Sequence, residues 1–304
     1  MSKTKAWLNA MRLRTLPLSL AGIIMGSAIA YYQDFWNGWI FGLALTTTIL
    51  FQILSNLAND LGDGIKGTDN AERVGPARMV QSGTISAKEM KSSVVLTAIL
   101  SLLSAGGLIY VGVQEMPAFM LWLYVGLALL CVLAAITYTV GKKAYGYHGL
   151  GDLMVFIFFG GVSVLGVYSL FAKNFDATNV LLAITSGLLS TAVLNLNNMR
   201  DRVNDAKSGK NTLVVKMGAN YAKLYHAFLI IGSLISLGAF IAQFDQPLLF
   251  ITMLPGLLLL LHLRTVMQTS QPQAFDPELK KVALSTFAIS IVLFGAIIYL
   301  KSTM

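Results

Sequence analysis

The stretch NGWIFGLALTTTILFQILSNLANDLGDGIKGTD, from Asn37 to Asp69, contains an apolar run that is immediately followed by carboxylates. The run is long enough to cross a bilayer, which takes about 20 residues of helix. Three acidic side chains then follow within ten residues, at Asp60, Asp63 and Asp69. Acidic side chains at the end of a membrane helix are costly unless they are paired or bound to something, so this stretch predicts both a fold and a site.

The composition of the chain is that of an integral membrane protein. Of its 304 residues, 56% are hydrophobic and only 12% are charged, whereas a soluble domain has roughly 25% charged residues. The short alternating strands of a membrane barrel are missing, which leaves helices as the spanning form. We therefore predict an all-α polytopic helical bundle, formed by one domain over residues 1–304, with about nine spans near 15–33, 37–58, 92–113, 118–140, 150–172, 178–197, 222–243, 247–267 and 282–300.

The basic residues predict the orientation of this bundle. With these spans, 20 of the 22 Lys and Arg residues lie on one side, and only Lys173 and Lys301 lie on the other. Positively charged loops stay in the cytoplasm, so we expect a cytoplasmic N-terminus, a C-terminus on the opposite side and both acidic clusters at the cytoplasmic face. The net charge of +8 is explained by this topology and by attraction to anionic lipid, and it calls for no nucleic-acid partner.

A second acidic cluster follows the sixth span, in NLNNMRDRVNDAKSGKNTL from Asn195 to Leu213. At 100° per residue, each cluster continues the phase of its helix. Each helix thereby points one Asn and two Asp in one direction: Asn56, Asp60 and Asp63 in one helix, and Asn197, Asp201 and Asp205 in the other.

The four paired aspartates, Asp60, Asp63, Asp201 and Asp205, form a candidate metal site. Carboxylate and amide oxygens without a His or Cys cluster suit Mg²⁺, which usually bridges carboxylates to phosphate oxygens. Basic residues in the adjoining loops would close over a diphosphate: Lys66, Arg73, Arg78, Lys207 and Lys210. The combination predicts a lipid diphosphate ligand. The structural alternative pairs the acids with Arg200, Arg202 or Lys66.

The motifs NDLGD and KGTD, together with RDRVNDAKSGKNTL, resemble the two aspartate-rich motifs of the UbiA superfamily of intramembrane aromatic prenyltransferases. Three further segments are similar to the branch of that superfamily that prenylates 1,4-dihydroxy-2-naphthoate in menaquinone synthesis: RLRTLP, GPARMVQSG and ITYTVGKKAYGYHGLGDLMVFIFFG. The sequence departs from this branch at Leu13, where proline is frequent. The third acid of the first motif is Asp69, behind Gly67, rather than the residue four beyond Asp63.

The resemblance implies Mg²⁺-dependent transfer of a polyprenyl group from a polyprenyl diphosphate to 1,4-dihydroxy-2-naphthoate, with loss of CO₂, giving a demethylmenaquinol. The paired aspartates would hold the metal with Asp69 as a further catalytic acid, and Arg14, Asn56, Lys66, Arg78, Asn197 and Lys210 would bind substrate. Acceptor contacts are expected from Tyr138, Lys142 and Asp152. The lone residues Cys131, His226 and His262 are interpreted as packing residues of apolar spans.

Two other functions are consistent with parts of the pattern. An ion-coupled secondary transporter also uses repeated helices with buried acids, although its site usually lies near the middle of the membrane. A prenyltransferase of the same superfamily that acts on another aromatic acid, such as 4-hydroxybenzoate, would share the metal and diphosphate motifs.

Overall fold

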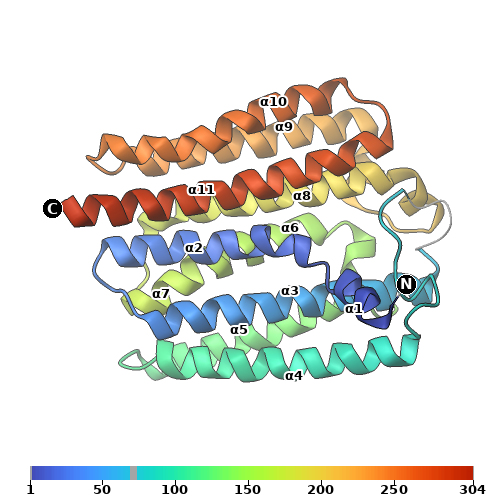
Figure 1. Cartoon of the computed structure of the whole chain (residues 1–304), viewed down its shortest axis with the longest axis horizontal. Helices are drawn as coiled ribbons and strands as arrows, with labels where there is room; N and C mark the ends of the chain where they lie inside the picture. Colours follow the sequence, from blue (N-terminus) through green and yellow to red (C-terminus); the bar gives the residue numbers. More distant parts are fainter. Residues whose placement is uncertain (1, 69–73, 304) are drawn as a thin grey trace.

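The computed structural model describes residues 2–68 and 74–303, and it confirms the predicted all-α membrane bundle. Within these residues, nine helical segments are long and apolar enough to cross a membrane. They lie roughly parallel, with the two chain ends on opposite sides of the bundle (Figure 1). In chain order the elements are α1 Lys3–Met11, η1 Leu13–Thr15, α2 Leu16–Tyr32, α3 Gly38–Lys66, α4 Ala87–Gly112, α5 Ala118–Thr137, η2 Tyr145–His148, α6 Gly151–Phe156, η3 Ile157–Gly166, α7 Val167–Ala172, η4 Ala177–Asn179, α8 Val180–Lys207, α9 Leu213–Ile241, η5 Pro247–Met253, α10 Leu254–Gln268, η6 Pro272–Ala274 and α11 Phe275–Thr303.

Helices α3 and α8 continue for two turns or more beyond the apolar runs that define their spans. Both acidic clusters therefore lie on helix, as their phase predicts. Helix α3 ends at Gly67, whose φ of 70° is the left-handed conformation that glycine adopts without strain. The amide of Thr68 then donates to the carbonyl of Asp63 at 3.1 Å, which turns the chain back over the helix end.

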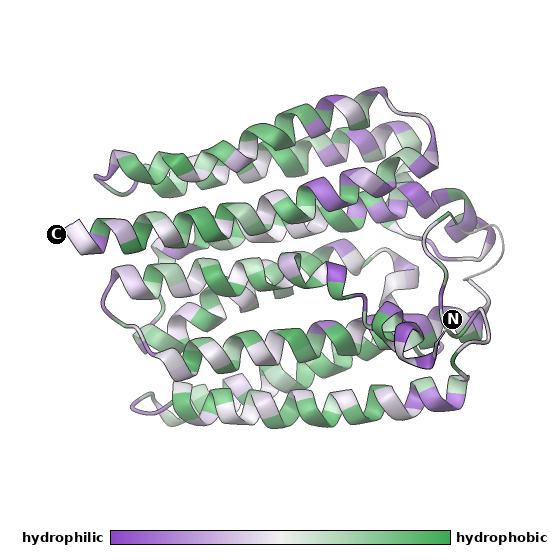
Figure 2. Cartoon of the chain, in the orientation of Figure 1, coloured by the Kyte–Doolittle hydropathy of each residue, from purple (hydrophilic) through white to green (hydrophobic). Residues whose placement is uncertain are grey.

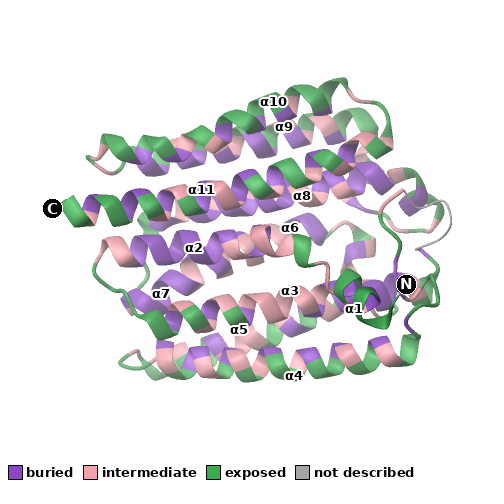
Figure 3. Cartoon of the chain, viewed as in Figure 1, coloured by how far each residue is buried: buried purple, intermediate pink, exposed green. Residues whose placement is uncertain are grey.

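Hydrophilic residues gather at the end of the bundle that carries the N-terminus, whereas the helix surfaces between the two ends are mostly hydrophobic (Figure 2). We call this end the polar end; it contains the C-terminal ends of α3 and α8. Large apolar side chains such as Trp39, Leu103 and Trp122 are exposed on the outside of the bundle, as expected for contact with lipid. The most continuous burial lies along α2 and α8 (Figure 3).

The C-terminal helices carry a buried polar chain of their own. The Nε2 atoms of His226 on α9 and His262 on α10 are 2.8 Å apart, and Nδ1 of His262 lies 2.5 Å from Glu278 Oε2 on α11. Lys281 Nζ lies 2.6 Å from the second oxygen of Glu278. The contacts join three neighbouring helices, so the two histidines, interpreted from the sequence as lone packing residues, contact each other and Glu278.

A π-helix, η3, lies between α2 and α8 and is held there by glycine contacts. A Cβ atom added at Gly160 would lie 2.5 Å from the carbonyl oxygen of Ala183 and 3.0 Å from Gly187 Cα, so α8 approaches to backbone contact. A Cβ atom at Gly26 would likewise lie 2.5 Å from the carbonyl oxygen of Val164. These close approaches fix the π-helix, which carries part of the cavity wall described below.

The first testable prediction concerns this packing. Gly160→Val forces backbone apart and should cost about 1–3 kcal/mol of stability, which lowers the midpoint of thermal unfolding in detergent by at least about 2 °C. Gly161→Val is the matched control, because a Cβ atom at Gly161 meets nothing within 4 Å. Equal unfolding midpoints for the two variants would contradict the close contact between η3 and α8.

Candidate active site

A cavity of about 340 Å³ runs along the inside of the bundle from the polar end. Its walls come from α2, α3, α4, α5, η3 and α8. On α3, both Asp63 and Ala44 line it, a separation of about 30 Å of helix at 1.5 Å per residue. The cavity is therefore nearly as long as the hydrocarbon core is thick.

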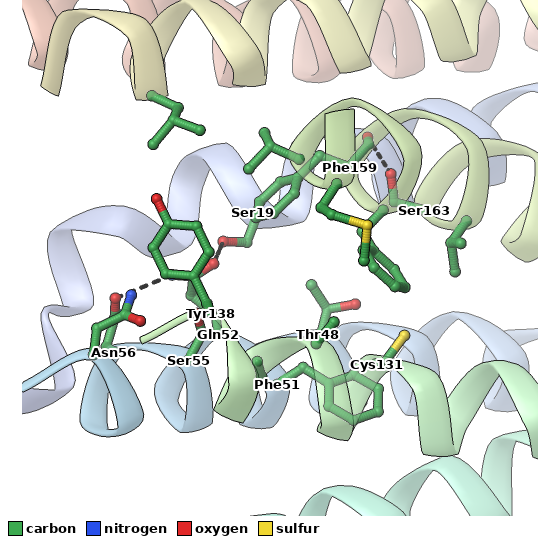
Figure 4. Close-up of a pocket in the computed structure, with 18 of the residues that line it drawn as sticks. Ser19, Thr48, Phe51, Gln52, Ser55, Asn56, Cys131, Tyr138, Phe159 and Ser163 are labelled. Atoms are coloured by element: carbon green, nitrogen blue, oxygen red, sulfur yellow. Dashed lines mark hydrogen bonds between the residues drawn. The ribbon is translucent and has the colours of Figure 1, made fainter. Parts of the chain in front are cut away.

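The lining changes character along the cavity. In the close-up of Figure 4, Gln52, Asn56 and Tyr138 lie towards one side of the pocket, and Cys131 lies on the other side with Thr48 and Ser163. Towards the polar end the wall is formed by polar side chains: Arg12, Asn59, Asp63, Thr68, Arg78, Asn197, Asn198, Asp201, Asn204, Asp205 and Lys210. The remaining length is largely apolar. Such a cavity suits a ligand with a charged head and a long hydrocarbon tail.

Lys210 joins the two acidic clusters. Its Nζ lies 3.7 Å from Asp63 Oδ2 and 3.9 Å from Asp205 Oδ1, and all three side chains are largely buried. Burial lowers the pKa of the Lys210 ammonium, but the carboxylates of Asp63 and Asp205 outweigh this and raise the pKa above its usual value. The two carboxylates thus favour the charged form of Lys210 between the ends of α3 and α8.

Hydrogen bonds hold the loops around this centre. The phenol of Tyr147, in η2, donates to Asp63 Oδ1 at 2.8 Å and lies 2.5 Å from the hydroxyl of Thr68. Burial raises the pKa of Tyr147, and the charge of Asp63 adds to this, so the phenol stays a donor. The side-chain amide of Asn204 donates to the carbonyl of Thr68 at 2.9 Å. The ends of α3 and α8 and the η2 segment thus form one connected network.

Asp201 also lines the cavity, but both of its oxygens accept hydrogen bonds from Arg200, at 3.0 Å from Nε and 2.7 Å from the terminal nitrogen. Arg200 in turn reaches Asp276 on α11 at 2.6 Å. The pairing with Arg200 considered above is therefore present at Asp201, although each carboxylate oxygen has a further lone pair that a metal could use. Its charge is compensated before any ligand binds.

Asp60 is placed differently from the other predicted metal ligands. It does not line the cavity, and its two oxygens accept the backbone N–H groups of Met79 and Val80, each at 3.0 Å. These two hydrogen bonds direct the Asp60 carboxylate away from the cavity and towards the backbone of residues 79 and 80.

The carboxylates that remain fit a Mg²⁺ ion that a phosphate completes. Among the described residues, no group of three His, Cys, Asp or Glu side chains is arranged to hold a metal by itself. Mg²⁺ rarely takes a full protein cage and is commonly bound by one or two carboxylates together with substrate phosphates and water. Asp63 and Asp205, already on either side of a cation, and Asp201 supply such a partial oxygen set.

Residues 19–299 match the UbiA prenyltransferase family. The chain belongs to this family. It is 44% identical to 1,4-dihydroxy-2-naphthoate octaprenyltransferase of Escherichia coli, over 92% of this chain and 91% of that protein. It is 43% identical to the enzyme of the same name from Haemophilus influenzae, over 95% and 94% of the two chains. The apo structure of a UbiA homolog from Aeropyrum pernix superposes with a TM-score of 0.68 at 16% identity, covering 96% of this chain and 99% of that one, and so shares the fold.

Only some of the other predicted site residues of this UbiA-family chain line the cavity. Asn56, Arg78, Asn197 and Tyr138 line the cavity, together with Lys210. Arg14, Lys66 and Lys142 are exposed and do not line it, although Lys66 Nζ lies 3.9 Å from the centre of the Tyr147 ring. Asp152 lines a separate cavity of about 290 Å³ with Tyr225. Asp69 and Arg73 lie outside the described residues.

Several lining residues were not predicted from the sequence. Arg12 reaches the cavity where Arg14 does not, because Asn56 donates to the carbonyl of Met11 at 2.9 Å and to Thr15 Oγ1 at 3.0 Å and so fixes the turn between α1 and α2. Asn59, Thr68, Asn204 and Tyr145 also belong to the wall. Asn59 could have been found, because it lies three residues beyond Asn56 on the same helix. The others depend on loop geometry.

The second prediction tests Lys210 in this prenyltransferase. Lys210→Met keeps roughly the volume of the side chain. It leaves the carboxylates of Asp63 and Asp205 without their cation and removes a positive charge from the polar end of the cavity. We expect kcat/KM for a prenyl diphosphate to fall about 10²–10³-fold. The exposed Lys143→Met is the matched control and should stay within about twofold. A Lys210 variant that is folded and kinetically unchanged would contradict a role at the site.

Proposed function

We propose that this chain transfers a polyprenyl group from polyprenyl diphosphate to 1,4-dihydroxy-2-naphthoate, with loss of CO₂, giving a demethylmenaquinol. The observation that carries the proposal is that one cavity combines two features. Lys210 and three aspartates lie at its polar end, and a largely apolar wall continues from them over nearly the thickness of the hydrocarbon core. The identities of 43–44% to enzymes named for this acceptor support the choice of substrate.

The polar end would hold the diphosphate. Asp63, Asp201 and Asp205 would bind Mg²⁺, which as a Lewis acid stabilises the negative charge of the departing diphosphate. Lys210 and Arg78, both in the cavity wall, would contact the same oxygens. Arg12 adds a third cation at this end. The protein groups therefore meet the charge that develops when the carbon–oxygen bond of the donor breaks.

The wall beyond the polar end would protect the allylic carbon. Aromatic faces stabilise a nearby cation, and an apolar enclosure keeps water from capturing it. Tyr138, Tyr145 and Phe158 belong to the cavity wall and would supply such faces. The naphthoate ring would attack at its carboxyl-bearing carbon, so that a carbon–carbon bond forms while CO₂ leaves, and the electron pair of the broken bond restores the aromatic ring.

The proposed orientation places the polar end at the cytoplasmic face of a bacterial inner membrane. The support is the distribution of Lys and Arg, 20 against 2 between the two sides of the predicted spans. A soluble acceptor and diphosphate product would then exchange with the cytoplasm, and the prenylated product would leave into lipid.

The third prediction distinguishes this acceptor from 4-hydroxybenzoate. Purified protein with Mg²⁺ and a long-chain prenyl diphosphate should release one labelled CO₂ per diphosphate from carboxyl-labelled 1,4-dihydroxy-2-naphthoate. Prenylation of 4-hydroxybenzoate at an open ring position would release none. Asp205→Asn serves as the matched inactive control. Prenylation with the carboxylate retained would refute the proposed acceptor and leave the diphosphate site in place.

A further inference from the structure

Asp60 makes a two-point contact with the loop that carries Arg78. Met79 donates its backbone N–H to Asp60 Oδ2 and Val80 donates to Oδ1, both at 3.0 Å, and Asp60 is 1% exposed. Hydrogen bonds from consecutive amides to an ionised carboxylate are among the stronger ones in proteins, and the paired geometry fixes direction as well as distance. The contact therefore defines where residues 79 and 80 lie relative to α3.

The packing around this contact leaves the loop little freedom. Met79 is buried in the same apolar cluster as Leu57 and Leu61 of α3, and its carbonyl accepts the amide of Ile85 at 3.1 Å. A Cβ atom at Gly64 would lie 2.8 Å from Val80 Cγ1, so Val80 rests directly on the helix. Arg78 precedes the anchored pair, is buried, and lines the active-site cavity.

We infer that Asp60 is a positioning residue that acts through Arg78, rather than a ligand of the metal or a contact of the substrate. Both of its oxygens are directed at backbone amides outside the cavity. The carboxylate therefore ties the loop to the last turns of α3 and sets the position from which Arg78 reaches the diphosphate. Asp63, one turn later, has the other task of lining the cavity beside Lys210.

The test uses Asp60→Asn, which keeps the shape of the side chain but turns one acceptor into a donor. Hydrogen exchange resolved to single amides should show loss of protection at Met79 and Val80 by about tenfold or more. Asp63→Asn is the matched control, and its exchange at these two amides should equal that of the wild type. This readout needs no substrate and stands even if the proposed function is wrong.

The kinetic arm rests on the proposed function. Asp60→Asn should raise the donor KM about tenfold or more and leave the half-saturating Mg²⁺ concentration within about twofold of the wild type. Asp63→Asn should shift that Mg²⁺ concentration. In a double-mutant cycle, Arg78→Ala should cost less in the Asp60→Asn background than in the wild type, because the two side chains act in series.

Two outcomes would overturn the inference. One is an Asp60→Asn protein that keeps full protection of the Met79 and Val80 amides and shifts its Mg²⁺ dependence as Asp63→Asn does, which would make Asp60 a metal ligand. The other concerns the wild type alone and applies even where the variant does not fold. If the Met79 and Val80 amides exchange as fast as the amide of the exposed Ala77, the two-point contact does not exist in solution.

Discussion

The buried ion cluster of Lys210, Asp63 and Asp205 is the interaction on which the rest of the structure depends. Moving a carboxylate out of water costs several kcal/mol even after the protein relaxes, and the cost is met here because one ammonium lies between two carboxylates that come from different helices. The arrangement only exists if α3 and α8 both extend past their apolar runs and end side by side. The polar end of the cavity and the loop contacts at Thr68 and Tyr147 surround that meeting point.

A cation already at the centre of the site also explains how the same residues can serve a diphosphate. The carboxylates are arranged around positive charge, and Lys210 keeps its proton because they raise its pKa. If a metal and a diphosphate bind there together, as proposed, the net charge of the cluster would change little. The protein would then not have to reorganise a charged centre inside the membrane, where reorganisation is expensive.

The sequence predicts the fold almost completely, because bilayer thickness and hydrophobic run length are simple constraints. It also predicts that both acidic clusters lie on one connected site. The sequence does not show that Asp60 and Asp63 have different environments, because their side chains differ by only about 60° around α3. The loop that carries Met79 and Val80 directs Asp60 away from the cavity through two backbone hydrogen bonds. The same limit applies to Arg12 and Arg14, because the hydrogen bonds that Asn56 donates to Met11 and Thr15 fix the turn that carries them. It applies also to Asp152, which lines a second cavity. The hydropathy of residues 157–166 predicts a membrane span but does not distinguish the π-helix η3 from an α-helix.

The most direct test of the central claim is the position of a metal in the bound protein. A crystal structure with Mn²⁺ in place of Mg²⁺ and a non-reactive prenyl thiodiphosphate allows the metal to be located by its anomalous scattering. We expect a peak between the ends of α3 and α8, within about 2.2 Å of a carboxylate oxygen of Asp63 or Asp205, with the hydrocarbon chain running into the apolar length of the cavity. A peak bound by Asp60, or a diphosphate held away from Lys210, would contradict it.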